Sequence, residues 1–149
     1  MNVKEVSPRE AFELMTSLGY TYLDVRSIPE FTAGHATGAV NIPLMHLDER
    51  SGQMVPNPEF LEVVQANFPP DTKLVIGCHS GGRSMHACQL LGQIGYAHVL
   101  NIRGGFGGAQ DRFGRLVERG WAEAGLPVDQ TGGEGISYES LAGKVKTAR

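Results

Sequence analysis

The chain of 149 residues has the length of a single domain, and its composition excludes several classes of protein. Hydrophobic residues make up 41% and charged residues 19%, which is typical of a globular protein rather than a disordered one. The net charge of −3 argues against nucleic acid as the main ligand, because binding many phosphates requires an excess of Lys and Arg. No stretch is apolar enough for a membrane span or a signal peptide, so we expect no membrane partner and a cytoplasmic location, or an organellar one after removal of a transit peptide.

Short β-rich runs alternate with amphipathic helical runs, which predicts an α/β domain with a mainly parallel sheet. In chain order we expect a helix at 8–18, a strand at 21–25, one helical turn at 30–33, a strand at 39–42, a helix at 58–68, a strand at 73–77, a helix at 84–94 and a strand at 97–102. The domain is expected to occupy residues 1–128. A tail at 129–149 follows, with a mobile Gly-rich stretch at 130–135 and a loosely docked helix at 138–148.

Local signals mark the first of these helices. Ser7 and Glu10 form the pattern of a capping box, and Pro8 stands at the first helical position. The helix at 58–68 is expected to end before Pro69 and Pro70, because proline cannot continue a helix.

The segment at 78–84, Cys-His-Ser-Gly-Gly-Arg-Ser, connects the strand at 73–77 with the next helix. Two adjacent glycines allow a tight turn with inward-pointing backbone N–H groups, since glycine adopts positive φ and has no side chain to block the ring. The start of the helix adds unpaired amides and the positive end of its dipole. The loop therefore predicts an anion-binding cradle with Cys78 at its mouth.

Cys78 is the predicted nucleophile. Helix amino ends and nearby cations favour the thiolate, which is the reactive form of cysteine. The same cradle would hold the outer sulfur of a persulfide on Cys78, because that sulfur is also an anion. Cys88 lies on the apolar face of the following helix and is expected to be a small core residue. Both thiols are expected to be free, and a Cys78–Cys88 disulfide is the weaker alternative.

The pattern Cys78-x-x-Gly81-x-Arg83 resembles the active-site loop of the rhodanese (thiosulfate sulfurtransferase) family. Other segments are similar to further landmarks of that family, in the same order: Leu23-Asp24-Val25-Arg26, Glu30, Gly34-His35, Gly38-Ala39-Val40-Asn41-Ile42-Pro43, Gly95-Tyr96, Gly104-Gly105-Phe106, Trp121 and Ala124-Gly125-Leu126-Pro127-Val128. The resemblance covers residues 4–128. It implies one rhodanese domain, with a five-stranded parallel sheet flanked by helices and a transferable sulfur on Cys78.

The resemblance also implies a double displacement, in which Cys78 takes sulfur from a small anionic donor such as thiosulfate and passes it to a thiophilic acceptor. Arg83 is expected to bind the sulfonate end of the donor, with pairing to a carboxylate as the alternative. His79 acts either as an acid–base group or only as part of the pocket rim. Ser84 either donates its hydroxyl to the sulfur or caps the helix. The active-site loop is expected to comprise His79, Ser80, Gly81, Gly82, Arg83 and Ser84.

Asp24 and Arg26 end a predicted strand, as Cys78 does. The carboxyl ends of parallel strands meet at one edge of a sheet, so we expect all three residues along that edge. Asp24 and Arg26 are expected to form an ion pair with a mainly structural role. No cofactor is expected, and no metal, because the remaining histidines lack the spacing of zinc ligands: His35, His46, His86 and His98.

Several alternatives remain at this stage. Four residues separate Cys78 from Arg83, whereas phosphatases with a related loop have five, so a phosphatase or arsenate reductase is less favoured. Mercaptopyruvate is a second candidate donor, but the family's enzymes for it tend to lack the loop arginine. A persulfide carrier that docks on a partner is the alternative from another functional class. The acceptor is expected to be a thiol, a thioredoxin-like dithiol or another protein.

One segment departs from the family pattern. Gly105 and Trp121 are 16 positions apart, whereas the family usually separates them by a few residues. The insertion, at 107–119, contains a predicted hairpin turn at 111–115. It is expected to be a solvated surface loop, although its arginines would alternatively attract an anionic donor or contact an acceptor protein. These arginines are Arg112, Arg115 and Arg119.

Overall fold

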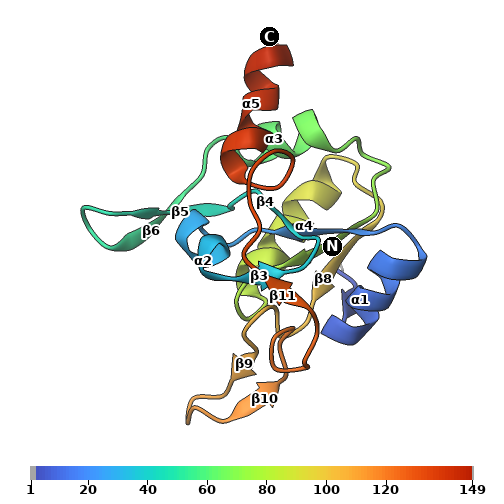
Figure 1. The fold of residues 1–149 in the computed structure, drawn as a ribbon, viewed down its shortest axis with the longest axis vertical. Helices are drawn as coiled ribbons and strands as arrows, with labels where there is room; N and C mark the ends of the chain where they lie inside the picture. The colour runs from blue at the N-terminus through green and yellow to red at the C-terminus, as the bar shows by residue number, and fades with distance from the viewer. Residues whose placement is uncertain (1–2, 149) are drawn as a thin grey trace.

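A five-stranded sheet forms the centre of the computed structural model, which describes residues 3–148 (Figure 1). Each neighbouring pair of strands is parallel, which confirms the expected α/β fold. In spatial order the strands are β1 (Glu5–Val6), β8 (Val99–Ile102), β7 (Leu74–Gly77), β2 (Thr21–Asp24) and β4 (Val40–Asn41). The edge strand β1 was not predicted, because two residues are too short to show a strand pattern.

Helices connect the strands and cover both faces of the sheet. They are α1 (Pro8–Ser17), α2 (Ile28–Ala33), α3 (Phe60–Asn67), α4 (Gly82–Gln93) and α5 (Tyr138–Ala148). The capping box at Ser7 is confirmed, and a second one at Ser27 starts α2 earlier than expected. No helix in the described part of the chain combines the length and the apolar character needed to cross a membrane.

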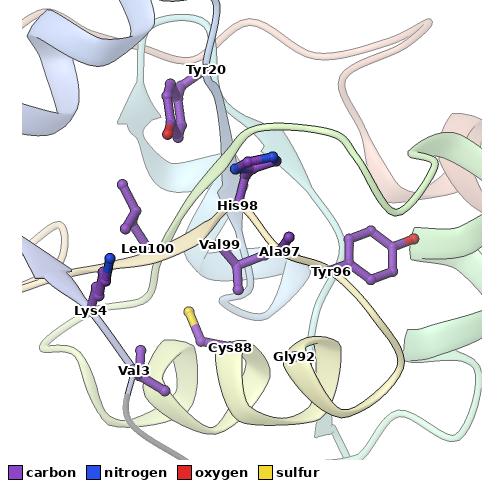
Figure 2. Close-up of a pocket in the computed structure, with 10 residues that line it drawn as sticks. All are labelled: Val3, Lys4, Tyr20, Cys88, Gly92, Tyr96, Ala97, His98, Val99 and Leu100. Atoms are coloured by element: carbon purple, nitrogen blue, oxygen red, sulfur yellow. The ribbon is translucent and has the colours of Figure 1, made fainter.

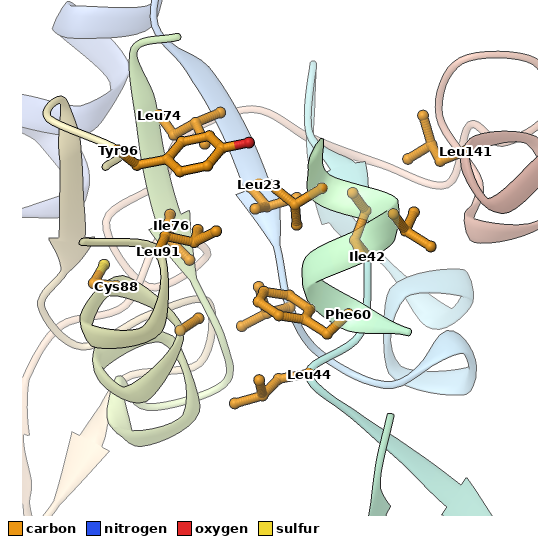
Figure 3. Packing of buried hydrophobic residues seen from close by; sticks show 14 of the residues in the cluster. Leu23, Ile42, Leu44, Phe60, Leu74, Ile76, Cys88, Leu91, Tyr96 and Leu141 are labelled. Atoms are coloured by element: carbon orange, nitrogen blue, oxygen red, sulfur yellow. The ribbon is translucent and has the colours of Figure 1, made fainter. Parts of the chain in front are cut away.

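Side chains of the central strands alternate between two cores, as the two-residue period of a strand requires. Leu74 and Ile76 of β7 pack with residues of α3, α4 and α5, and Figure 3 shows this cluster. Val75 packs on the opposite face with α1, α2 and Trp121. Leu18 and Ile94, the last residues of the expected helices at 8–18 and 84–94, are exposed, because each is the C-cap at which its helix has already ended.

The carboxyl-terminal helix α5 forms part of the core. Leu141 and Val145 are buried in the same cluster as β7, and the Asn67 side chain of α3 donates a hydrogen bond to the Leu141 carbonyl at 2.9 Å. The helix therefore begins where expected, but it is not loosely docked. A domain boundary near residue 128 stays a prediction.

Three short two-stranded sheets lie outside the central one. They are β3 (His35–Ala36) with β11 (Val128–Asp129), β5 (Met45–Asp48) with β6 (Gln53–Pro56), and β9 (Ala109–Gln110) with β10 (Leu116–Glu118). All three pairs are antiparallel. None of these strands was predicted as such, although a turn at 111–115 was.

The insertion is the β9–β10 hairpin, which projects from one end of the molecule (Figure 1). The Asp111 side chain accepts hydrogen bonds from the amides of Phe113 and Arg115, which confirms the expected turn. The two ends of the insertion meet at its base, where the Trp121 amide donates a hydrogen bond to the Gly105 carbonyl at 2.8 Å. Gly105 and Trp121 are thus in contact, although they are 16 positions apart in the sequence.

Candidate active site

The active-site residues predicted from the sequence gather where β2 and β7 end. Asp24 pairs with Gly77 in the sheet register, and the Val25 amide donates to the Gly77 carbonyl at 3.0 Å. From β2 the chain moves to β4 on one side, and it later returns to β7 on the other side. Loops diverge at such a change of direction and leave room for a ligand. Cys78 follows β7 directly at this point.

The Cys78 sulfur is held at the amino end of α4. Its Sγ accepts a hydrogen bond from the Gly81 amide at 3.0 Å and lies 3.4 Å from the Ser84 hydroxyl oxygen. Gly81 has φ 118°, a conformation that favours glycine and turns its amide toward the sulfur. The amides of Gly82 and Arg83 lie in the first turn of α4, where they have no acceptor within the helix. The start of α4 at Gly82, two residues earlier than expected, therefore adds donors to the cradle.

Residues 104–107 hold the loop from behind. The Phe106 amide donates to the Cys78 carbonyl, and the Gly107 amide donates to the His79 carbonyl, both at 2.8 Å. Gly105 approaches so closely that a Cβ there would collide with the Cys78 carbonyl oxygen. Gly105 therefore helps to position the loop that carries Cys78.

Arg83 points to a carboxylate across the site. Its Nη1 and Nη2 donate to the two carboxylate oxygens of Glu30 at 2.8 and 3.0 Å. Partial burial disfavours ionisation of Glu30, but the hydrogen bonds from Arg83 and Ser27 outweigh it and lower the pKa of Glu30 to about 2. Glu30 matches a family landmark in the sequence but was not predicted as a site residue. Its charge and its place in a capping box were the available signals.

The pKa of Glu30 leads to a test of the ion pair. A carboxyl group with a lowered pKa stabilises the folded state above its unfolded pKa near 4.5, and this contribution disappears as the pH falls toward 2. We therefore expect Glu30→Gln to lose less free energy of unfolding than the unmodified chain between pH 5 and pH 3. Urea unfolding at several pH values measures this difference. Parallel pH profiles for the two proteins would contradict the pairing.

The expected ion pair between Asp24 and Arg26 is present. Arg26 is 3% exposed, its Nη2 lies 2.8 Å from Asp24 Oδ2, and the same nitrogen donates to the Gly34 carbonyl. The guanidinium carbon also lies 4.4 Å from the centre of the Phe106 ring. A hollow of about 430 Å³ beside the loop is lined by Arg26, Glu30, Ala33, Gly34, His79, Phe106 and Val128. Cys78 itself is buried, and its neighbour His79 lines this hollow.

His79 and Ser80 are exposed on the loop, so their side chains lie at the rim rather than in the cradle. The His79 ring packs against Gly107, where a Cβ would collide with it. Asn101, near the end of β8, contacts Ser84 from behind the cradle, although it was not predicted as a site residue. The available signal was its position in a parallel strand whose carboxyl end lies at the same edge of the sheet as Cys78.

Cys88 lies farther along α4 and is buried. Burial, followed by the neighbouring charges of Cys78 and Glu5, raises the pKa of the Cys88 thiol to about 12. Its side chain extends toward β8 beside a hollow of about 340 Å³ that is separate from the active-site loop (Figure 2). Cys88 is free in the structure, as is Cys78, so the two expected free thiols are confirmed.

Comparisons with known proteins agree with this geometry. The family model for the rhodanese-like domain matches residues 7–111. Thiosulfate sulfurtransferase 16, chloroplastic, of Arabidopsis thaliana is 38% identical over 123 residues, which cover 83% of this chain and 90% of that protein. Thiosulfate sulfurtransferase 18 of the same plant is 42% identical over 106 residues, which cover 70% of this chain and 76% of that protein.

A solved structure shows the same fold. The crystal structure of Rv0390 from M. tuberculosis superimposes with a TM-score of 0.71 at 24% identity and covers 88% of this chain and all of that one. At this identity the likeness concerns the fold alone. The match to the family model and the identity to the two plant proteins go further, and together they show that the chain belongs to the rhodanese-like domain family.

Proposed function

We propose that this chain is a sulfurtransferase that carries the transferred sulfur on Cys78 as a persulfide. The observation that carries the proposal is the Gly81 amide, 3.0 Å from the Cys78 sulfur at the amino end of α4. An amide donor and the positive end of a helix dipole both favour a negative sulfur at this place. The names of the two plant relatives support the same reaction class.

The proposed reaction has two displacement steps. In the first, the Cys78 thiolate attacks the outer sulfur of thiosulfate, a new S–S bond forms, and the S–S bond of the donor breaks with its electron pair leaving on sulfite. In the second, an acceptor thiolate or cyanide attacks the outer sulfur of the persulfide, and the Cys78 thiolate is released. Each step leaves negative charge on sulfur, which the donors at the start of α4 stabilise. Covalent catalysis of this kind predicts ping-pong kinetics.

The direct test is mass spectrometry of the protein after incubation with thiosulfate. We expect a gain of about 32 Da, the mass of one sulfur atom, on the peptide that contains residue 78. Treatment with cyanide or a dithiol should remove it. A protein that gains no mass, or gains it only on the peptide with Cys88, would contradict the proposal.

Thiosulfate is the proposed donor because Arg83 offers a cation near the loop, with N–H groups beyond the two that bind Glu30. Glu30 competes with an anionic donor for this guanidinium. We expect Glu30→Gln to lower the KM for thiosulfate about threefold to tenfold, and Arg83→Ala to raise it by a similar factor, with little change in kcat. Glutamine keeps the capping box at Ser27, so α2 should remain intact.

Steady-state assays with thiosulfate and cyanide measure both constants. An unchanged KM in both variants would place the donor site away from Arg83. Mercaptopyruvate, assayed in parallel, tests the second candidate donor, because its carboxylate would respond to the same two substitutions.

A persulfide carrier is the second candidate function, and the β9–β10 hairpin favours it. The hairpin begins next to Gly107, which binds the active-site loop, and it exposes Phe113 and Val117 by 76% and 59%. Exposed apolar side chains at such a place are typical of a contact with another protein. Rapid loading of Cys78 with slow turnover to cyanide would identify a carrier.

Deleting residues 108–118 separates catalysis from docking. The Trp121–Gly105 hydrogen bond closes the base of the hairpin, so the shortened chain should fold. We expect its kcat/KM with thiosulfate and cyanide to stay within about twofold of the full chain. A large loss with these small substrates would show that the hairpin contributes to the site itself.

The cytoplasmic location stays a prediction, and the name of the chloroplastic relative supports testing an organellar one. Fractionation of source cells, followed by detection of the full-length protein, distinguishes the two.

A further inference from the structure

A chain of polar contacts leads from Cys78 through the interior to the surface at the edge strand β1. Ser84 of α4 and Asn101 of β8 are 0% and 1% exposed, and Glu5 of β1 is at the surface. The Ser84 hydroxyl oxygen lies 3.4 Å from the Cys78 sulfur and 2.5 Å from Asn101 Oδ1. Asn101 Nδ2 lies 2.9 Å from Glu5 Oε2. Neither Asn101 nor Glu5 has a part in the proposed reaction as described so far.

The partners of Asn101 determine which way its amide faces. An ionised carboxylate and a backbone carbonyl only accept hydrogen bonds. Asn101 Nδ2 faces both kinds of group, Glu5 Oε2 and, at 3.5 Å, the Gly81 carbonyl oxygen. The Asn101 group that faces Ser84 is therefore the carbonyl oxygen Oδ1, which also only accepts. The Ser84 hydroxyl oxygen also lies 3.2 Å from the Gly81 carbonyl oxygen, but its closest contact is the one of 2.5 Å to Asn101 Oδ1. Two oxygens this close need a proton between them, so the single hydroxyl proton of Ser84 points to Asn101.

This orientation limits what Ser84 offers to Cys78. With its proton on the Asn101 side, the hydroxyl oxygen presents only lone pairs to the sulfur, so it accepts from a thiol S–H and does not donate to a negative sulfur. Donation requires the hydroxyl to turn and to leave Asn101 Oδ1 without this donor. Ser84 is the one donor to Asn101 Oδ1 among residues 3–148, and a buried acceptor left without a donor costs free energy, so Asn101 opposes this rotation of the hydroxyl.

We propose that Asn101, oriented by Glu5, is a positioning residue that controls through the Ser84 hydroxyl how readily the Cys78 sulfur becomes negative. In the resting state the Ser84 hydroxyl donates to Asn101 and not to the sulfur. When the thiolate or the persulfide forms, the Ser84 hydroxyl turns away from Asn101 and donates to the charged sulfur, because a charged acceptor makes the stronger hydrogen bond. No covalent bond changes in this step, since the proton stays on the Ser84 oxygen and only its direction changes.

The test measures the rate at which iodoacetamide alkylates Cys78 as a function of pH, in a Cys88→Ala background that leaves one thiol. We expect Asn101→Ala to move the half-maximal rate to lower pH by about one unit, which is about a tenfold faster reaction on the acidic side. Glu5→Gln should move it in the same direction by a smaller amount, because Asn101 is then free to reverse its amide. Glu5→Gln alters an exposed residue, so it provides the test if Asn101→Ala does not fold.

Ser84→Ala distinguishes the network from a general effect on the loop. If Asn101 and Glu5 act through the Ser84 proton, the Asn101 substitution should cause no further shift once Ser84 is alanine, and the Glu5 substitution should cause a smaller shift than it does with Ser84 present. Loss of the Glu5 charge would by itself favour a negative sulfur, but that effect persists without Ser84 and is therefore separated. Glu13→Gln, which removes an exposed carboxylate from α1, is the matched control and should leave the profile unchanged. Asp24, Arg26, Glu30, His79 and Arg83 are the same in all these variants.

A shift of equal size with and without Ser84 would overturn the proposal, and so would the absence of a shift in both the Asn101 and Glu5 variants. The inference deepens the proposed function, but its test needs no sulfur donor. If thiosulfate leaves no persulfide on Cys78 while the alkylation profiles behave as expected, the proposed function fails and the network stands. If a persulfide forms while the alkylation profiles stay unshifted, the proposed function stands and the network fails.

Discussion

Cys78→Ser is expected to lower the rate of sulfur transfer from thiosulfate to cyanide by at least about a thousandfold. The serine oxygen is protonated at neutral pH and cannot form a persulfide, so neither displacement step proceeds. The fold should be retained, because serine is close to cysteine in size and its oxygen can accept the hydrogen bond that the Gly81 amide now donates to sulfur. Transfer kinetics and the urea unfolding curve measure the two effects separately.

Cys88→Ala is the matched control for this variant. Cys88 is buried, and its pKa of about 12 leaves almost no thiolate near neutral pH, so transfer should stay within about twofold of the unmodified chain. Transfer by Cys78→Ser within tenfold of the unmodified rate, or loss of transfer in Cys88→Ala, would show that Cys78 is not the nucleophile.

Gly105→Ala is expected to destabilise the protein by about 2–5 kcal/mol and to displace the active-site loop. Gly105 has φ 56°, at which a residue with a Cβ is strained by about 1–2 kcal/mol. The new methyl group would also collide with the Cys78 carbonyl oxygen and the His79 backbone, and such overpacking typically costs about 1–3 kcal/mol. Because the collision is with the loop itself, transfer activity should fall together with stability.

Gly19→Ala separates the two contributions. Gly19 has φ 73°, similar to that of Gly105, but nothing lies within 4 Å of the position of its Cβ. It should therefore lose only about 1–2 kcal/mol and keep full activity. Urea unfolding and steady-state assays of both variants provide the comparison. Equal losses of stability in the two variants, with activity retained in both, would show that the close approach of Gly105 does not position the loop.

Elements with strong local signals were predicted well from the sequence. The capping box at Ser7, the apolar run of β7 and the glycine-rich turn after it each depend on residues adjacent in the chain. Elements without such signals were missed, among them β1 and the β3–β11 pair, which have two residues in each strand. Their strand conformation comes from pairing with distant segments, which local propensity does not describe. The close packing of α5 was missed for the same reason.

The sequence alone was enough to propose Cys78 as the nucleophile and to place it between a strand and a helix, because Cys78, Gly81 and α4 are close neighbours along the chain. The partners of the cradle were decided only by the tertiary structure. Arg83 meets Glu30 across 53 positions, and Ser84 meets Asn101 across 17. These contacts arise when α2 and β8 pack beside the start of α4. A pattern of hydrophobic and polar residues indicates that such elements form, but the packing of one element on another determines which of their polar side chains meet.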